Sequence, residues 1–381
     1  PTPAPSGSPS DRDVLSPTPE PTPETPQGYR IEAFFGTGDI GYWGDGGLAV
    51  EATIYKPSSL FGTPDGRVYV SDFGFDTVRY VDLNTGVAHH VYGIQETKDA
   101  SESVKAAEAP VAKPEGIAFD SKGRLFVAQN GFAGGIPGKI RMVDAVGNTY
   151  TFAGGGTEPV TDGAHALSVT LDHPAGIAFD DQDNLYVAEN GANRILKITP
   201  DRIITIVAGT GEMGFSGDGG PATEAKLTWP QGLVLDPQGR VVFADQYNHR
   251  IRRISKDGTI ETIAGTSAGF SGDGGPASAA QLNQPGAIAY DVSGNLIIAD
   301  SNNNVIRRVT PEGVITTIAG TPPAAPEESE NATAMDASGG DGGPALQASL
   351  DFPSGLYVGS DGAIYVADRG NHRVRVLKPE P

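Results

Sequence analysis

One phrase recurs six times along the chain at nearly equal spacing, and this periodicity constrains the fold more than any other feature. Each copy has a proline, a small or apolar pair, a strand-like run, a polar turn and a second strand-like run, as in KPEGIAFDSKGRLFVAQ and WPQGLVLDPQGRVVFAD. Successive marker prolines are 57, 60, 56, 55 and 68 residues apart. Such a period is the signature of a repeat architecture. The markers are Pro57, Pro114, Pro174, Pro230, Pro285 and Pro353.

Each repeat contains four strand-like runs, which in the fourth copy are GLVLD, RVVFAD, HRIRRIS and TIETIAG. Glycine, aspartate and asparagine separate the first three runs, and β-branched residues are enriched within them. Four antiparallel strands repeated six times around an axis predict an all-β protein, a six-bladed β-propeller.

The two ends of the repeat region predict how the ring closes. The sixth copy stops after its third strand, HRVRVLK, at residues 372–378. The missing strand is available near the N-terminus, because YRIEAFFGTG at 29–38 matches the fourth-strand sequence GTIETIAGTS at 258–267. We therefore expect an N-terminal strand clasp formed by residues 29 to about 36, which leaves no long free sheet edge.

The repeat resembles the NHL repeat in four successive motifs, PxGIAxD, GNLYVAD, NxRIRRV and ITTIAG. Its GFSGDGGPA variant is similar to the NHL domains of teneurins and of many bacterial exported proteins. The resemblance covers residues 29–381. It implies a β-propeller, and teneurin propellers make protein contacts at the cell surface. Because NHL-type domains held outside the membrane by a linker also occur in bacterial receptor kinases, we expect an extracellular or cell-surface protein whose partner is another protein.

The linkers between repeats carry an Asp-Gly-small core, and three of them continue Gly-Gly-Pro-Ala. We expect each aspartate to accept hydrogen bonds from nearby backbone N–H groups and fix a turn before one or two helical turns. The alternative is an aspartate and carbonyl loop that binds calcium. The aspartates are Asp45, Asp162, Asp218, Asp273 and Asp341.

A second acidic residue ends the second strand of most repeats, and in three copies an arginine follows five residues later. Such a pair would close the turn between strands two and three. The three predicted pairs are Glu189 with Arg194, Asp245 with Arg250, and Asp368 with Arg373.

The turns between strands two and three share one face of a propeller with the blade-to-blade linkers. We expect partner contacts on this face, because exposed aromatic and basic residues on loops of a rigid scaffold suit protein recognition. The predicted contacts are Trp43, Phe75, Tyr247, His249 and His372.

Composition limits the remaining function classes. The chain has 27 basic and 47 acidic residues, a net charge of −20, which argues against nucleic acid or an anionic membrane as partner. It has no cysteine, and its six histidines show no metal-ligand spacing, so we expect no catalytic site, no metal and no cofactor other than the calcium alternative. The competing hypothesis is a lactonase-like or lyase-like propeller enzyme with a metal in the central channel.

Residues 1–28 hold nine prolines and almost nothing to bury. This composition predicts an extended stalk, behind a removed signal sequence, a lipid anchor or a membrane helix, and the alternative is a disordered tail. The predicted organisation is therefore a stalk over 1–28 and a propeller over 29–381.

Overall fold

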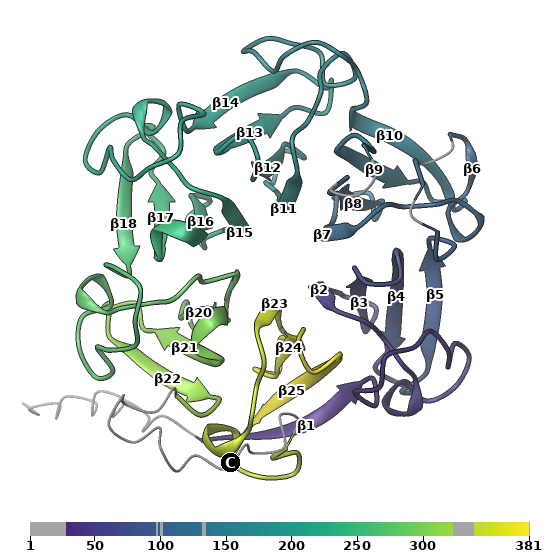
Figure 1. Cartoon of the computed structure of the whole chain (residues 1–381), viewed down its shortest axis with the longest axis vertical. Coiled ribbons are helices and arrows are strands. Elements are labelled where there is room, and N and C mark those ends of the chain that lie inside the picture. Colours follow the sequence, from purple (N-terminus) through teal and green to yellow (C-terminus); the bar gives the residue numbers. More distant parts are fainter. Residues whose placement is uncertain (1–27, 97, 100–101, 132–134, 323–338, 381) are drawn as a thin grey trace, which may run out of the picture.

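The computed structural model describes residues 28–96, 98–99, 102–131, 135–322 and 339–380, so most of the predicted stalk lies outside the described residues. Six antiparallel sheets surround a central axis as blades (Figure 1). The predicted six-bladed all-β propeller is confirmed.

The blades follow one another in chain order. Blade 1 comprises β2 (Pro57–Thr63), β3 (Arg67–Asp72), β4 (Thr77–Asp82) and β5 (Ala88–Tyr92). Blade 2 comprises β6 (Val104–Lys105), β7 (Pro114–Phe119), β8 (Leu125–Gln129), β9 (Lys139–Val143) and β10 (Asn148–Gly154). Blade 3 comprises β11 (Pro174–Phe179), β12 (Leu185–Glu189), β13 (Arg194–Ile198) and β14 (Ile204–Ala208). Blade 4 comprises β15 (Pro230–Leu235), β16 (Val241–Asp245), β17 (Arg250–Ile254) and β18 (Ile260–Ala264). Blade 5 comprises β19 (Ala287–Tyr290), β20 (Leu296–Asp300), β21 (Val305–Val309) and β22 (Ile315–Ala319). Blade 6 comprises β23 (Pro353–Val358), β24 (Ile364–Asp368) and β25 (Arg373–Pro379), and is completed by β1 (Tyr29–Phe35).

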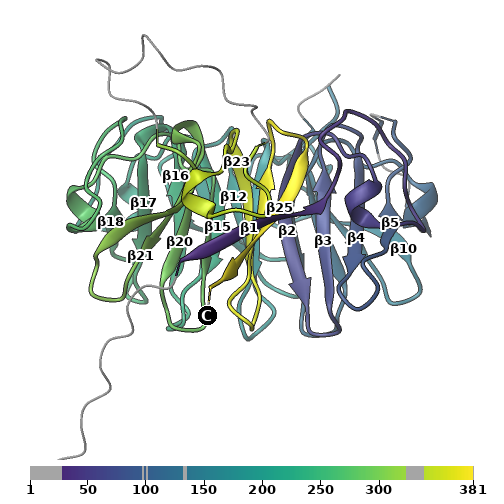
Figure 2. The same cartoon turned by 90° about the horizontal axis from the view of Figure 1, so that it is seen from below.

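The N-terminal clasp is present. β1 pairs antiparallel with β25 from Tyr29 opposite Pro379 to Phe35 opposite Val374. Ile31 and Phe35 are fully buried, so the strand contributes core as well as hydrogen bonds. Figure 2 shows β1 crossing β25 on the side of the disc, where the two chain ends of the propeller meet.

The glycine two residues after most marker prolines lets neighbouring inner strands approach each other. A Cβ atom on Gly176 would lie 2.2 Å from the Gln231 carbonyl oxygen of the next blade, and one on Gly116 would lie 2.2 Å from the Ala175 carbonyl. Since real Cβ atoms do not approach oxygen so closely, the PxG element of the repeat sets the width of the ring.

The Asp-Gly-Gly linkers pair with the outer strands, which differs from the predicted position on the face of the two-three turns. The Gly219 amide donates to the Ile260 carbonyl at 2.8 Å, and the Ile260 amide donates back to Gly220 at 3.0 Å. In the linker before blade 4, the start and the end lie at the turn face, and the middle runs along the outer wall beside the fourth strand. This pairing covers the sheet edge that a blade would otherwise expose.

A single 3-10 turn follows the Asp-Gly-Gly pairings, within the one or two helical turns expected. In the linker before blade 4, Gly209 donates to the Ala222 carbonyl and Ala222 donates to the Gly258 carbonyl, so the turn joins the outer strands of adjacent blades. The turn begins after Pro221, whose ψ of 129° is extended, so the proline precedes the helix rather than opening it. The wall turns are η1 (Ala49–Glu51), η2 (Ala106–Glu108), η3 (Ala222–Glu224), η5 (Ala277–Ala279) and η8 (Ala345–Gln347).

Buried arginines hold four of the linkers. Arg252 is 0% exposed and donates to the Lys226 carbonyl, the Ser216 carbonyl and the Asp218 carboxylate at 3.1, 2.8 and 2.8 Å. The same arrangement recurs with the arginine 34 residues after the linker aspartate. The other pairs are Asp45 with Arg79, Asp273 with Arg307, and Asp341 with Arg375.

These contacts correct two predictions about charged residues. The linker aspartates accept from arginine side chains, except Asp162, whose blade has Leu196 at the arginine position and which accepts the Ile206 amide at 2.7 Å. Of the predicted turn pairs, Glu189 and Arg194 form an ion pair at 2.5 Å. The other two acids instead contact arginines two residues further on, Asp245 with Arg252 at 3.4 Å and Asp368 with Arg375 at 3.6 Å.

Candidate binding face and channel mouth

The turns between strands two and three define one face of the disc, which we call the turn face. It includes residues 73–76, 190–193, 246–249, 301–304 and 369–372, with η4 (Gln246–Asn248) and η6 (Ser301–Asn303) among them. β25, the third strand of its blade, starts at this face and runs away from it toward the C-terminus. The C-terminus lies at the lower rim in Figure 2, so the turn face is the upper rim.

His249 lies on the turn face but joins two blades. It has a left-handed φ of 57°, and its Nδ1 accepts the Gln284 amide of the next blade at 3.1 Å. Nδ1 is therefore unprotonated, and burial lowers the pKa of His249. Asn193 and Asn304 accept equivalent amides, from Trp229 at 3.0 Å and Phe352 at 2.9 Å. The predicted partner contact at His249 thus already has a structural role.

Phe75 and His372 come together although they are distant in the sequence. Both rings contact Tyr55, with centroid distances of 5.7 Å for Phe75 and 4.9 Å for His372. His372 Nδ1 also lies 3.1 Å from the Arg369 carbonyl oxygen. All three rings are partly buried, so this cluster closes the joint between blades 6 and 1 and offers limited free surface.

Tyr247 belongs to a group of exposed apolar side chains on the turn face. Tyr247 is 48% exposed and its ring lies 6.0 Å from Trp229. Met213 and Phe215, 65% and 42% exposed, arrive from the preceding linker, which the Asn248 side chain fixes by donating to the Gly214 carbonyl at 2.7 Å. Met213, Phe215, Trp229 and Tyr247 form what we call the blade 4 patch.

Trp43 lies in the linker before blade 1, at the position that Ser216 has in the linker before blade 4. It is 58% exposed beside Ile40, which is 61% exposed, while its carbonyl accepts from the buried Arg79. Of the five predicted contacts, Trp43 and Tyr247 therefore have the largest free surfaces, and they belong to different blades.

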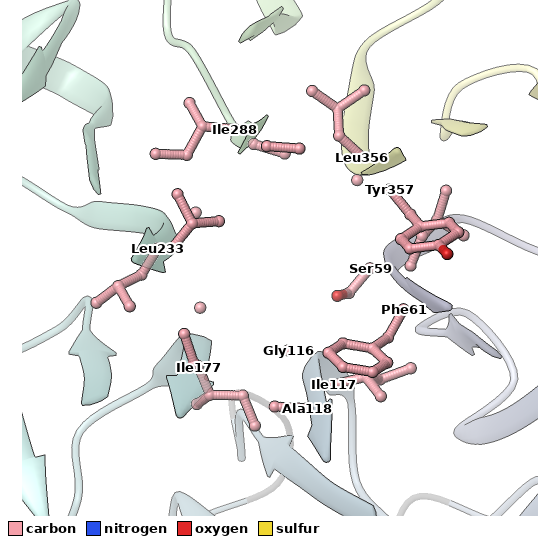
Figure 3. Close-up of a pocket in the computed structure, with 18 of the residues that line it drawn as sticks. Ser59, Phe61, Gly116, Ile117, Ala118, Ile177, Leu233, Ile288, Leu356 and Tyr357 are labelled. Atoms are coloured by element: carbon pink, nitrogen blue, oxygen red, sulfur yellow. The ribbon is translucent and has the colours of Figure 1, made fainter. Parts of the chain in front are cut away.

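A cavity of about 420 Å³ occupies the centre of the ring, lined by the inner strands of all six blades. Figure 3 shows Ile117, Ile177, Leu233, Ile288 and Leu356 around it. These residues stand three positions after the marker prolines and form an apolar waist. The channel can therefore take an apolar group, in the size range of about 300–1,000 Å³ that is usual for small-molecule pockets.

Among the described residues that line this cavity, Glu115 is the one that carries a charge, and it lies at the turn-face end. Glu115, one residue after its marker proline, is half-buried there, and the Gln231 side-chain amide donates to its Oε2 at 3.4 Å. Burial raises the pKa of Glu115, and the nearby Arg369 guanidinium opposes that rise. Arg369 is half-buried and stacks 4.6 Å over the Phe73 ring. Within the described chain, Glu115 and Arg369 form no ion pair with each other.

No metal site is evident in the described parts of the channel and the linkers. Among the described residues, no three histidine, aspartate or glutamate side chains are grouped as metal ligands would be. In four linkers, a guanidinium already contacts the aspartate that the calcium alternative requires.

Comparison with known families agrees with this architecture. The Teneurin NHL domain model matches residues 211–273 and 275–378, and the NHL repeat model matches residues 171–198. The chain belongs to the NHL-repeat propellers. Teneurin-1 of Homo sapiens is 28% identical to this NHL propeller over 361 residues, 87% of the chain but 12% of teneurin-1. NHL repeat-containing protein 2 of Homo sapiens is 24% identical over 290 residues, 68% of the chain and 40% of that protein.

Solved structures share the fold of this NHL propeller at low identity. An auxiliary nutrient binding protein from Bacteroides thetaiotaomicron has a TM-score of 0.64 at 14% identity, over 93% of the chain and 77% of that structure. Virginiamycin B lyase from Staphylococcus aureus, solved with quinupristin, has a TM-score of 0.55 at 14% identity, over 92% of the chain and all of that structure. At these identities the likeness concerns the fold alone.

Several residues of the NHL propeller's turn face were missed by the sequence prediction. Trp229 precedes a marker proline and was interpreted only as part of the repeat, and Tyr55, two residues before Pro57, was not predicted to contribute. Glu115 and Arg369 are single departures from the repeat, so aligning the six copies at these positions is the signal that would have found them.

Proposed function

We propose that this propeller is a non-catalytic binding module that recognises another protein through the blade 4 patch. The observation that carries this proposal is the clustering of four large apolar side chains on fixed loops. Trp, Tyr, Phe and Met are the residue types enriched at interface cores, and rigid loops lose little entropy on binding.

The contacts that support the patch do not involve the Met213 or Tyr247 side chains. Arg250 stacks 3.8 Å over the Phe215 ring, and the Tyr247 amide donates to the Thr228 carbonyl at 3.2 Å. The backbone contact survives removal of the tyrosine ring. The patch can therefore be changed without dismantling the blade, which makes the proposal testable.

The resemblance to teneurins supports an extracellular or cell-surface location, and we propose that the partner is met there. No helix in the described ranges is long and apolar enough to cross a membrane. Electrostatic complementarity with a net charge of −20 favours a partner whose contacting surface is basic.

Site-specific photo-crosslinking in the native cell tests the proposal. A photoreactive residue at Tyr247 or Met213 is expected to capture one protein, and the same residue at Val292, 77% exposed in a turn on the opposite face, is the matched control. The captured protein, once purified, should bind the wild type directly and bind a Met213→Ala, Tyr247→Ala double variant at least about tenfold more weakly. Equal capture at Val292, or unchanged affinity of the double variant, would place the interface elsewhere.

A further inference from the structure

The turn face breaks the sixfold repeat at two positions beside the channel mouth. The residue after the marker proline is serine, alanine, glutamine or glycine in five blades and glutamate only at Glu115. The residue after the last position of strand two is phenylalanine, asparagine, glutamine or serine in five blades and arginine only at Arg369. A charge that occurs in one blade only is not required by the repeat that builds the ring.

Both charges are left with unused hydrogen-bonding capacity. In the part of the chain that the structure describes, the Glu115 carboxylate accepts one hydrogen bond, the long one from Gln231, and the Arg369 guanidinium donates none. Each nevertheless lies in a half-buried position where desolvation is costly unless a partner is supplied. Arg369 is held in place by Phe73, and Gln231 by the Asn190 side-chain amide 2.6 Å from its Oε1.

The two charges together define the ligand head. A simple cation at Glu115 would be repelled by Arg369, and a simple anion at Arg369 would be repelled by Glu115. A zwitterion satisfies both, because a carboxylate pairs with a guanidinium in two parallel hydrogen bonds and an ammonium donates to the glutamate. Below the mouth, the waist of Ile117, Ile177, Leu233, Ile288 and Leu356 is apolar and would accept a hydrocarbon side chain (Figure 3).

We propose that the channel mouth binds a free apolar α-amino acid, with its carboxylate on Arg369, its ammonium on Glu115 and its side chain in the apolar waist. This site is separate from the protein-binding role of the blade 4 patch and does not depend on it.

Isothermal titration calorimetry on the full chain tests the site with L-phenylalanine and L-leucine as probes. At least one of them is expected to bind saturably. Three analogues of phenylalanine each remove one part: N-acetyl-L-phenylalanine removes the ammonium, 2-phenylethylamine removes the carboxylate and glycine removes the side chain. Each analogue is expected to bind at least about tenfold more weakly than L-phenylalanine, because it loses either one charge-assisted contact or the burial of the apolar side chain.

Substitutions locate the site. Glu115→Gln and Arg369→Gln are each expected to lower the affinity for the amino acid at least about tenfold. Both variants should have the melting temperature of the wild type. The matched controls, Glu224→Gln on the outer wall and Arg67→Gln on the opposite rim, and Tyr247→Ala in the blade 4 patch, should stay within about twofold of the wild type. The proposal is overturned if neither probe binds at millimolar concentration, if glycine binds as tightly as phenylalanine, or if both mouth variants retain wild-type affinity.

Discussion

Replacing Arg252 by methionine should destabilise blade 4 far more than the same replacement at Arg250, two residues earlier on β17. Arg252 is fully buried and donates to two carbonyls and two carboxylates, one of which, Asp245, has a side chain that is 0% exposed. Arg250 is partly exposed and donates to one carbonyl, that of Asn248 at 3.0 Å.

The magnitude follows from what remains after the substitution. Removing one partner of a buried ion pair typically costs about 3–5 kcal/mol, because the other charge stays behind. Asp245 keeps its hydrogen bonds from the Thr228 amide and the Asn248 side chain, and a buried methionine recovers apolar contact, so we expect about 3–4 kcal/mol for Arg252→Met. For Arg250→Met we expect about 1 kcal/mol, since it loses one hydrogen bond and its stacking on Phe215.

Urea unfolding followed by circular dichroism measures both variants. Burial raises the pKa of Asp245 to about 6, and loss of the guanidinium raises it further. A raised folded-state pKa means that stability is lost as pH rises, so the cost of Arg252→Met should be larger at pH 8 than at pH 5. If Arg252→Met unfolds within about 1 kcal/mol of the wild type at pH 8, the arginines are not what holds the linkers.

Further expectations concern the clasp, the glycine ring, a buried acid and calcium. Deleting residues 1–36 should lower the melting temperature strongly while deleting 1–27 should not, because only the former removes β1; equal melting temperatures would contradict the clasp. Gly176→Ala should cost about 1–3 kcal/mol in urea unfolding, since its Cβ would meet the Gln231 carbonyl, whereas an unchanged stability would mean that the inner strands are not in tight contact. Burial raises the pKa of Asp72 to about 7, so the folded protein keeps a proton that the unfolded chain releases, and the free energy of unfolding falls as pH rises through 5 to 7. Asp72→Asn should remove about 2 kcal/mol of that fall. A variant whose stability changes with pH in parallel with the wild type would refute the assignment. Calcium or a chelator should leave the melting temperature unchanged within about 1 °C, because arginines occupy the linker carboxylates, and a large calcium-dependent rise would restore the metal-loop hypothesis.

The blades and the clasp could be predicted from the sequence because both depend on local pattern. Alternation, turn residues and the spacing of marker prolines define each strand, and the match of 29–38 to a fourth strand defines the closure. The signal for each strand lies within one repeat, and the signal for closure is the match between the N-terminal segment and the missing fourth strand of the sixth repeat. Neither signal requires knowledge of how distant parts of the chain pack.

The path of the linkers could not be predicted in the same way. Arg250 and Arg252 stand two residues apart on one strand and alternation gives them the same side, so the pairing with Asp245 was assigned to the wrong one. What separates them is coverage by the linker, which buries Arg252 and leaves Arg250 against Phe215. The constant spacing of 34 residues between linker aspartate and arginine was present in the sequence, but it becomes meaningful only once the linker is known to fold back on the next blade.

The difference between repeated and unrepeated residues separates architecture from function in this propeller. The linker aspartates, the buried arginines and the inner glycines recur from blade to blade, and each has contacts that account for it without a ligand. Glu115 and Arg369 each occur once at their repeat positions. Glu115 lines the shared cavity, Arg369 lies on the neighbouring turn of blade 6, and both retain hydrogen-bonding capacity that the described chain does not use. Sixfold symmetry can build a rigid ring, but it places the same group at six equivalent points and cannot by itself orient an asymmetric ligand. A ligand with distinct ends requires residues that depart from the repeat, and these two departures face one mouth of the channel.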